Sequence, residues 1–188
     1  MVMSHHDALS VLARHRGGRI VVTTMTSVGV WPSVSDTPLD FAYIPSAMGH
    51  GPALGLGLAL AQPERGVIVV NGDGCTLMNL GCLVTLAHHR ANVFLLVMDN
   101  ALYEVTGGQA VAGAGRTDFA GLARAAGIHR VHVFESRQAW EAGAAEALSG
   151  VGPAVVWLKL EGRLGQKTPK APRSMAEQIA RLREALGV

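Results

Sequence analysis

The stretch GDGCTLMNLGCLVTLAHHRANVFLLVMDN, residues 72–100, decides the fold of this chain. Its first three residues follow the apolar run 66–71, and a helix-forming segment then leads into a second apolar run, 93–98. This order is typical of a strand–helix–strand unit, whose two parallel strands end at the same edge of a sheet. Asp73 and Asn100 follow these two strands. A carboxylate and a carboxamide therefore meet at that edge, where their oxygens suit a hard cation such as Mg²⁺.

The residues around Asp73 favour an anionic ligand beside this cation. Gly72 and Gly74 carry no side chain that would block the backbone, and the start of the following helix presents free N–H groups. A tight turn that uses Asp and Gly for their backbone tolerance is the alternative interpretation. Asn100 at the end of the next strand favours the ligand, so the stretch predicts a site for a metal and a diphosphate.

Apolar runs alternate with helix-forming segments along the whole chain. Each expected strand is almost entirely apolar, as in parallel sheets that are covered on both faces. We therefore expect an α/β fold, a doubly wound parallel sheet with helices on both faces, and a single domain over residues 1–188. The expected strands are 19–24, 41–44, 66–71, 93–98, 131–134 and 154–160, the expected helices are 4–15, 52–61, 77–89, 119–126, 137–148 and 174–186, and a long glycine-bearing loop is expected at 99–115.

The composition argues against several classes of protein. Charged residues make up 16% of the chain, the formal net charge is +2, and no basic run alternates with aromatic residues, so we expect no nucleic-acid partner. No charged-then-apolar leader opens the chain, and no apolar run reaches the roughly 18 residues of a membrane span. Cys75 and Cys82 are too far apart on one expected helix for a disulfide and are interpreted as small buried thiols. A cytoplasmic protein is expected.

The Gly-Asp-Gly motif, with Asn100 after 25 intervening residues, resembles the signature of thiamine-diphosphate-dependent enzymes. The resemblance extends from about residue 23 to residue 160 and corresponds to the diphosphate-binding domain of that family. In the family, the Asp and the Asn bind Mg²⁺ together with the backbone carbonyl two residues after the Asn. The resemblance therefore implies Mg²⁺ ligands at Asp73, Asn100 and Leu102, and places Gly72, Gly74 and Cys75 at the diphosphate, with the last two offering backbone N–H groups.

The segment Ser46-Ala47-Met48-Gly49 resembles the part of the same family that holds the cofactor in a bent conformation. There, a bulky apolar side chain lies between the thiazolium and aminopyrimidine rings, and a backbone carbonyl just before it accepts from the 4′-amino group. The resemblance assigns the first role to Met48 and the second to the region of Ser46. A methionine that fills a gap in the core is the alternative for Met48. His50 is a further candidate for a place near the substrate.

The run YEVTGGQ, residues 103–109, resembles the Y-x-x-T-G-G-Q run of sulfopyruvate and phosphonopyruvate decarboxylases. Those enzymes decarboxylate 2-oxo acids that carry an anionic sulfonate or phosphonate group. In the sulfopyruvate enzymes the two cofactor-binding domains are often separate subunits, and the smaller one has about this length. The resemblance implies that Tyr103, Thr106 and Gly107 bind the cofactor, and that Gly108 and Gln109 lie with them at the entrance to the site. A flexible surface loop is the alternative.

The activating glutamate of the family is missing from this pattern. In the family it comes from the pyrimidine-binding domain, across a subunit interface. Glu64 lies before the Gly-Asp-Gly strand and Glu104 lies on the diphosphate side, so neither is an obvious candidate. We therefore expect a pyrimidine-binding partner subunit that supplies the glutamate in a hetero-oligomer. The apolar surface of the expected helices 52–61 and 77–89 is the expected interface.

The resemblance leaves three functions open. The first is the small subunit of a sulfopyruvate-type 2-oxo-acid decarboxylase. The second is a subunit of an acetolactate-synthase-like carboligase or of a 2-oxo-acid oxidoreductase, although the chain has no C-x-x-C motif for an iron–sulfur cluster. The third is a non-catalytic module that binds thiamine diphosphate. The identity of the substrate acid stays open.

Overall fold

Apolar, β-branched runs form the centre of the structure, a computed structural model that describes residues 2–165 and 169–188. They make one six-stranded sheet in the order β2-β1-β3-β4-β8-β7, and each pair of neighbouring strands in it is parallel. The strand order reverses between β1 and β3, and such switch points are where open α/β sheets bind ligands. The strands are β1 Ile20–Thr23, β2 Asp40–Ala42, β3 Val67–Gly72, β4 Val93–Asp99, β7 Arg130–Phe134 and β8 Ala154–Lys159.

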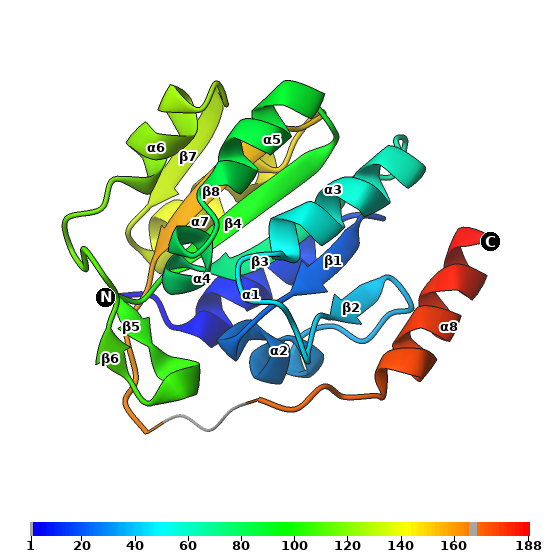
Figure 1. The fold of residues 1–188 in the computed structure, drawn as a ribbon, viewed down its shortest axis with the longest axis horizontal. Helices are drawn as coiled ribbons and strands as arrows, with labels where there is room; N and C mark the ends of the chain where they lie inside the picture. The colour runs from blue at the N-terminus through cyan, green and yellow to red at the C-terminus, as the bar shows by residue number, and fades with distance from the viewer. Residues whose placement is uncertain (1, 166–168) are drawn as a thin grey trace.

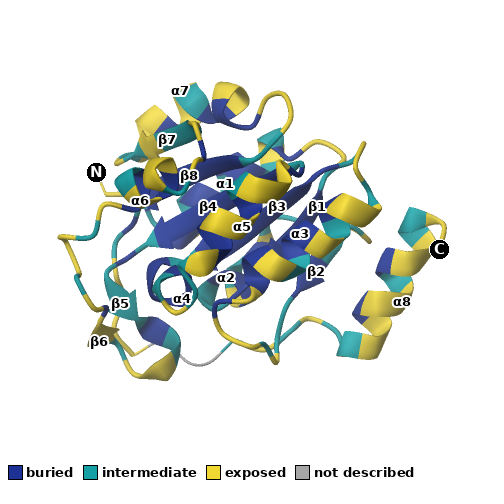
Figure 2. Ribbon diagram, turned by 45° about the horizontal axis from the view of Figure 1, so that its top comes forward, coloured by how far each residue is buried: buried dark blue, intermediate teal, exposed yellow. Residues whose placement is uncertain are grey.

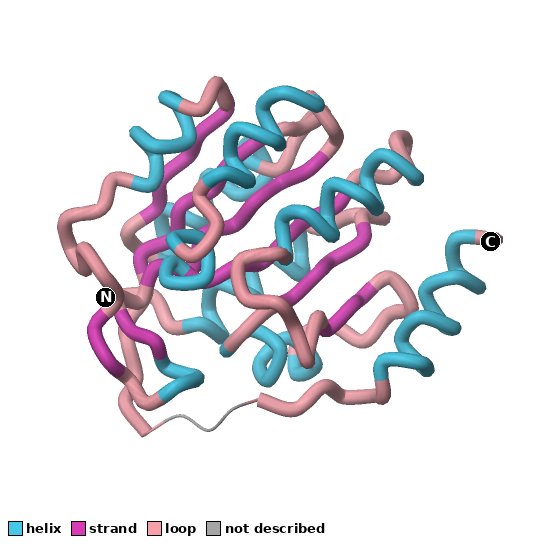
Figure 3. Tube along the Cα trace, in the orientation of Figure 1, coloured by secondary structure: helices cyan, strands magenta, loops and turns pink. Residues whose placement is uncertain are grey.

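Helices cover both faces of this sheet (Figure 1). Side chains from α3, α5 and α6 form a core with one face, and side chains from α1 and α7 form a second core with the other. The predicted doubly wound parallel sheet is thereby confirmed, and the tube in Figure 3 shows the alternation of strands and helices along the chain. The helices are α1 His5–His15, α2 Thr26–Val30, α3 Gly51–Ala61, α4 Asp73–Leu77, α5 Gly81–His89, α6 Phe119–Ala125, α7 Arg137–Ala147 and α8 Met175–Leu186, with short 3₁₀ turns η1 Trp31–Ser33 and η2 Glu104–Thr106.

Burial follows the layers of the fold. In Figure 2 the central strands are buried while the outer surfaces of the helices are exposed. The two cysteines are buried and free, as predicted. Within residues 2–165 and 169–188, no helix is both long enough and apolar enough to cross a bilayer.

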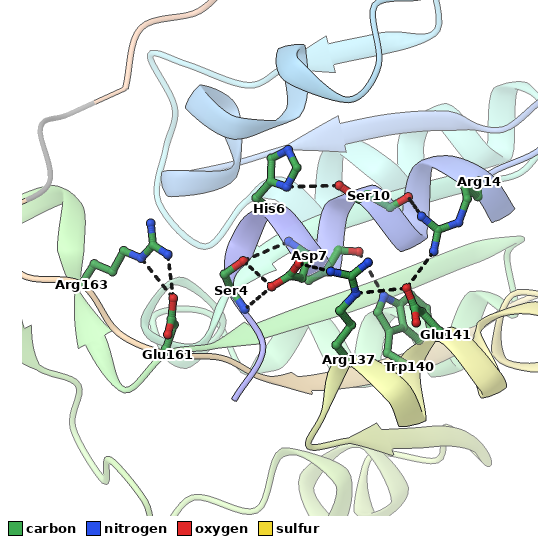
Figure 4. Close-up of polar contacts among 11 residues, drawn as sticks. Ser4, His6, Asp7, Ser10, Arg14, Arg137, Trp140, Glu141, Glu161 and Arg163 are labelled. Atoms are coloured by element: carbon green, nitrogen blue, oxygen red, sulfur yellow. Dashed lines mark hydrogen bonds and ion pairs between the residues drawn. The ribbon is translucent and has the colours of Figure 1, made fainter. Parts of the chain in front are cut away.

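Helices α1 and α7 pack side by side on the second face (Figure 4). Trp140 of α7 is fully buried and donates its indole N–H to the carbonyl of Ala8, at 3.0 Å. Around it, Arg137 pairs with Asp7 at 2.8 Å and Arg14 pairs with Glu141 at 3.2 Å. Exposed ion pairs of this kind contribute little to stability, so we attribute the packing mainly to the buried indole.

Helix α3 lies unusually close to β3 because of one glycine. A Cβ atom at Gly55 would overlap the Cγ2 atom of Val69, so only glycine allows this approach. Gly57 differs, because a Cβ atom there would meet no described atom within 4 Å. The packing of α3 on the sheet therefore requires glycine at position 55 but not at position 57.

Two expected segments have a different structure. The helix expected at 77–89 is divided into α4, which already begins at Asp73, and α5. The turn between them allows the Asn79 side-chain amide to donate to the carbonyl of Gly49, at 3.1 Å. The expected loop at 99–115 contains an antiparallel hairpin of β5 Leu102–Tyr103 and β6 Gln109–Ala110. The left-handed backbone of Gly107 and Gly108 reverses the chain between its strands.

Helix α8 covers the β2 edge of the sheet (Figure 1). The buried Gln178 accepts from the N–H of Ala42 at 2.7 Å and donates to its carbonyl at 3.3 Å. Asp36 pairs with Arg173 and Arg181 beside this contact. At Ala42, the outward-facing backbone of the edge strand is thus satisfied by a side chain rather than by another strand.

Candidate functional site

The predicted site residues come together in a pocket of about 180 Å³ at the carboxyl ends of β1, β3 and β4. Nine of the eleven residues predicted to bind the cofactor line this pocket, and Ser46 and Gly107 are not among the lining residues. Gly108 and Gln109, predicted at its entrance, are not among them either. The predicted residues that line it are Met48, Gly72, Asp73, Gly74, Cys75, Asn100, Leu102, Tyr103 and Thr106. The other lining residues are His5, Thr24, Met25, Thr26, Ser27, Met78, Met98, Glu104 and Val105.

Asp73 lies at the first position of α4, directly after β3, and is 3% exposed. Its Oδ1 atom accepts from the N–H of Gly74 at 2.8 Å, and its Oδ2 atom accepts from the N–H of Ala101 at 2.9 Å. The second bond ties the end of β3 to the end of β4. Each carboxylate oxygen has a second lone pair, through which it can bind a cation.

The raised pKa of Asp73 indicates that a bound cation would suit this position. Burial raises the pKa of Asp73 to about 7, and the neighbouring Asp99 carboxyl adds to this increase, while the N–H groups of Gly74 and Ala101 oppose it. The hydrogen bonds to Asp73 come from uncharged backbone groups. A divalent cation would favour the ionised carboxylate and so remove the cost of burying it.

Asn100 and Leu102 complete the predicted set of oxygen donors. Asn100 is 7% exposed, and its Oδ1 atom accepts from the N–H of Leu102 at 3.1 Å. Ala101 between them has a φ of 60°, a left-handed conformation that turns the chain at the end of β4. Carboxylate, amide and carbonyl oxygens form a donor set that fits Mg²⁺.

Gly74, beside Asp73, allows the side chain of Tyr103 to lie directly against the backbone. A Cβ atom there would overlap the ring of Tyr103, so the tyrosine packs directly on the glycine. In this arrangement the N–H of Gly74 donates to Asp73. Cys75 follows within α4, and burial raises the pKa of its thiol.

The loop before α3 places Met48 at the pocket. Met48 is 47% exposed, which is high for a methionine and argues against a core role. The loop is held because the N–H of Gly49 donates to the Sγ atom of Cys75 at 3.0 Å. His50 is exposed and its ring contacts the carbonyl of Met48, and it does not line the pocket.

Two polar groups of the site were not predicted from the sequence. Asn71, at the end of β3, is fully buried and accepts at Oδ1 from Thr24 at 2.9 Å. Its Nδ2 atom donates to Thr76 of α4, also at 2.9 Å. The position of Thr24 directly after β1 was the available signal, because residues at that sheet edge converge.

Glu104, His5 and Thr26 form the second polar group that was not predicted, and all three line the pocket. Glu104 is 3% exposed, accepting at Oε2 from Thr26 at 2.9 Å and at Oε1 from the N–H of Arg163 at 2.8 Å. His5 is also buried, and burial lowers its pKa. No sequence pattern joins these three residues, which lie in three distant segments.

Comparison with known sequences agrees with the site. The family model described as "Thiamine pyrophosphate enzyme, C-terminal TPP binding domain" matches residues 31–158. Phosphonopyruvate decarboxylase of Streptomyces viridochromogenes is 38% identical over 146 residues, which are 77% of this chain and 36% of that protein. Sulfopyruvate decarboxylase subunit beta of Methanococcus maripaludis is 33% identical over 165 residues, 85% of each chain. The chain thus spans only about a third of the Streptomyces relative but most of the Methanococcus subunit.

Solved structures with the same fold include two decarboxylases. The thiamine diphosphate-dependent 4-hydroxybenzoylformate decarboxylase of Rhodococcus jostii RHA1 has a TM-score of 0.72 at 18% identity, covering 86% of this chain and 33% of that one. Benzoylformate decarboxylase of Polynucleobacter necessarius has a TM-score of 0.72 at 20% identity, covering 88% of this chain and 34% of that one. These likenesses show the fold. By the match over residues 31–158, the chain belongs to the family of the C-terminal thiamine-pyrophosphate-binding domain of thiamine pyrophosphate enzymes, as its motifs predicted.

Proposed function

We propose that this chain is a single diphosphate-binding domain of a thiamine-diphosphate-dependent decarboxylase. Its substrate would be a 2-oxo acid with a sulfonate or phosphonate group, and its products CO₂ and an aldehyde. The observation that carries the proposal is the convergence of Asp73, Asn100 and Leu102 at one pocket. The names of the phosphonopyruvate and sulfopyruvate relatives support the reaction. When bound, thiamine diphosphate would supply the electron sink for decarboxylation.

Asp73, Asn100 and the carbonyl of Leu102 would hold Mg²⁺ in this proposal. Gly74 and Cys75 would donate N–H groups to the diphosphate beside Gly72. The hydrogen bond from the N–H of Gly74 to Asp73 supports a coupling between the binding of Mg²⁺ and the binding of the diphosphate. A cation at Asp73 would compete for the carboxylate and free the N–H of Gly74 for the diphosphate.

Met48, which lines the same pocket, would support the bent form of the cofactor. Its large exposed apolar side chain at the pocket suits a role that is completed by a bound ring system. Ser46 does not line the pocket, so its role through a backbone carbonyl would require the loop to settle against the cofactor. Tyr103 and Thr106 would close the diphosphate side, with Gly107 at the turn of the hairpin.

A partner subunit that binds the pyrimidine end would supply the activating glutamate. Glu104 is the one glutamate among the described lining residues, and both its oxygens already accept hydrogen bonds. None of these lining residues is Arg or Lys, so the anionic group of the substrate would also be recognised largely by the partner. A groove between α3 and α5, with Leu60 and Val84 exposed on these helices, supports the proposed interface.

A cytoplasmic location is part of the same proposal. Both cysteines are free and buried in the described structure, at Cys75 and Cys82. Unpaired thiols are usual in reducing compartments. Fractionation of cells that express the native chain would test this point, and recovery with the membrane or secreted fraction would contradict it.

Calorimetry of the chain with its co-purified partner tests the cofactor site. We expect Mg²⁺-dependent binding of thiamine diphosphate by the wild type and its loss in Asp73→Ala. Asp36→Ala is the matched control, because it removes an exposed aspartate that does not line the pocket. Tight Mg²⁺-dependent binding by Asp73→Ala would refute the assignment.

Release of CO₂ from a panel of 2-oxo acids tests the reaction. Sulfopyruvate and phosphonopyruvate are expected to react faster than pyruvate. A condensation product in place of an aldehyde would instead indicate a carboligase. Cofactor binding without turnover of any acid would indicate a non-catalytic module.

A further inference from the structure

Asp99, the last residue of β4, lies beside the proposed metal ligand Asn100 but is held by a different strand. Lys159 of β8 is its partner in the register of the sheet, and Trp157 lies two residues before Lys159 on the same face. The Oδ2 atom of Asp99 accepts from both the Trp157 indole N–H and the Lys159 ammonium, each at 2.9 Å. One carboxylate oxygen thus receives two donors from the neighbouring strand.

The two donors are themselves fixed. The Lys159 Nζ atom lies 3.8 Å from the centroid of the Trp157 ring, within the range of a cation–π interaction. Trp157 packs edge-on against Phe119, with ring centroids 5.7 Å apart. The side chain of Asp99 is 11% exposed and that of Lys159 is 31% exposed, so this pair is more shielded from water than a surface ion pair.

Asp99 also lies next to Asp73. Both residues line a small cavity together with residues of the segment 111–119, and the two carboxyls are close enough to interact. Their surroundings differ, because Asp99 is paired with an ammonium group whereas Asp73 is bonded to backbone N–H groups and lines the main pocket. Two carboxyl groups therefore lie next to each other beside the proposed metal site, and that of Asp99 is paired with an ammonium group.

We propose that Trp157 and Lys159 are positioning residues that hold Asp99 out of the coordination shell of the cation. The inference rests on the proposed metal site. Asp73 is then the one carboxylate in the proposed Mg²⁺ ligand set, and the ion depends on the diphosphate for the rest of its negative charge. Because the number of charged ligands sets the affinity of oxygen sites for such ions, this arrangement makes metal binding depend on the cofactor.

Binding of Mn²⁺ to the full chain with its co-purified partner tests the proposal without any measurement of turnover, because electron paramagnetic resonance detects the free Mn²⁺. Lys159→Met removes the ammonium and keeps a side chain of similar length. Without thiamine diphosphate, we expect this variant to bind Mn²⁺ about tenfold more tightly than the wild type, because Asp99 becomes available as a second carboxylate. Lys170→Met is the matched control for the loss of one positive charge and should bind as the wild type does.

The double variant Asp99→Asn/Lys159→Met separates the carboxylate from the lysine. It should bind Mn²⁺ no more tightly than the wild type, because the carboxylate is gone. Unchanged affinity in folded Lys159→Met, or equal tightening in the double variant, would overturn the inference. Failure of the wild type to bind Mn²⁺ even with thiamine diphosphate would instead refute the proposed metal site, and with it this inference.

Discussion

At the residue scale, Asp73 combines a buried position with a pKa of about 7. An aspartate of the unfolded chain ionises near 3.8. Because the folded pKa is the higher one, protonated Asp73 stabilises the metal-free fold fully below about pH 4, and this contribution is lost as the pH rises through 7. At neutral pH, the ionisation of the buried Asp73 therefore lowers the stability of the metal-free protein, and a bound cation would remove this loss.

Replacement of Asp73 by Asn should remove this pH dependence. The quantity to compare is the free energy of unfolding of Asp73→Asn minus that of the wild type, both with EDTA present. We expect this difference to increase by about 2 kcal/mol from pH 5 to pH 8. Urea unfolding at the two pH values measures the difference. A difference between the two proteins that is the same at both pH values would contradict the prediction.

Met48 and Met78 provide a matched pair at the pocket, because they are 47% and 50% exposed and both line it. Met48→Ala is expected to lower kcat/KM of the assembled enzyme by about tenfold, since it loses a contact with the bent cofactor. Met78→Ala should lower it much less. Thermal unfolding of the isolated chain should change little in either variant. Equal kinetic losses would argue against a special role of Met48.

At the element scale, the approach of α3 to β3 depends on which glycine faces the sheet. Gly55→Ala should destabilise the fold by about 1–3 kcal/mol, because its Cβ atom would overlap Val69. Gly57→Ala, on the same helix, should stabilise it by about 0.5–1 kcal/mol, because the new methyl group has space and alanine favours helix. Chemical denaturation of both variants measures these changes, and the same sign in both would contradict the packing described above.

The elements themselves were largely predictable because each strand is an apolar run between polar turns. Gly55 and Gly57 look alike in the sequence, since only the register of α3 on the sheet distinguishes them. The break between α4 and α5 was missed, although Asn79 and Gly81 lie at it, because the apolar residues on both sides were interpreted as one helix without a proline. The β5–β6 hairpin was missed because its two strands have two residues each, too few for a periodic pattern.

At the scale of the whole molecule, the site is built from segments that are far apart in the chain. The Asp73 and Asn100 pair was predictable because both residues follow strands of one strand–helix–strand unit. Glu104 was predicted to lie on this side, but its bonds to Thr26 and to the backbone of Arg163 were not, because tertiary packing alone brings these segments together.

The proposed assembly gives a prediction for the exposed surface of α5. Val84 is 59% exposed on that helix, and Val151 is 66% exposed in the loop before β8. Val84→Lys should abolish co-purification with the partner, because a charge would be buried at the proposed interface, while Val151→Lys should not. Size-exclusion chromatography with light scattering measures the assembly. Intact assembly in Val84→Lys would place the interface elsewhere.

The contact of Gln178 with Ala42 has a consequence for synthesis of the chain. These residues are 136 positions apart, so β2 leaves the ribosome long before the side chain that protects it. Until α8 follows, the backbone of β2 can accept a strand from another nascent chain. The β2 edge of the sheet is therefore protected from pairing with another chain only after α8 has been translated.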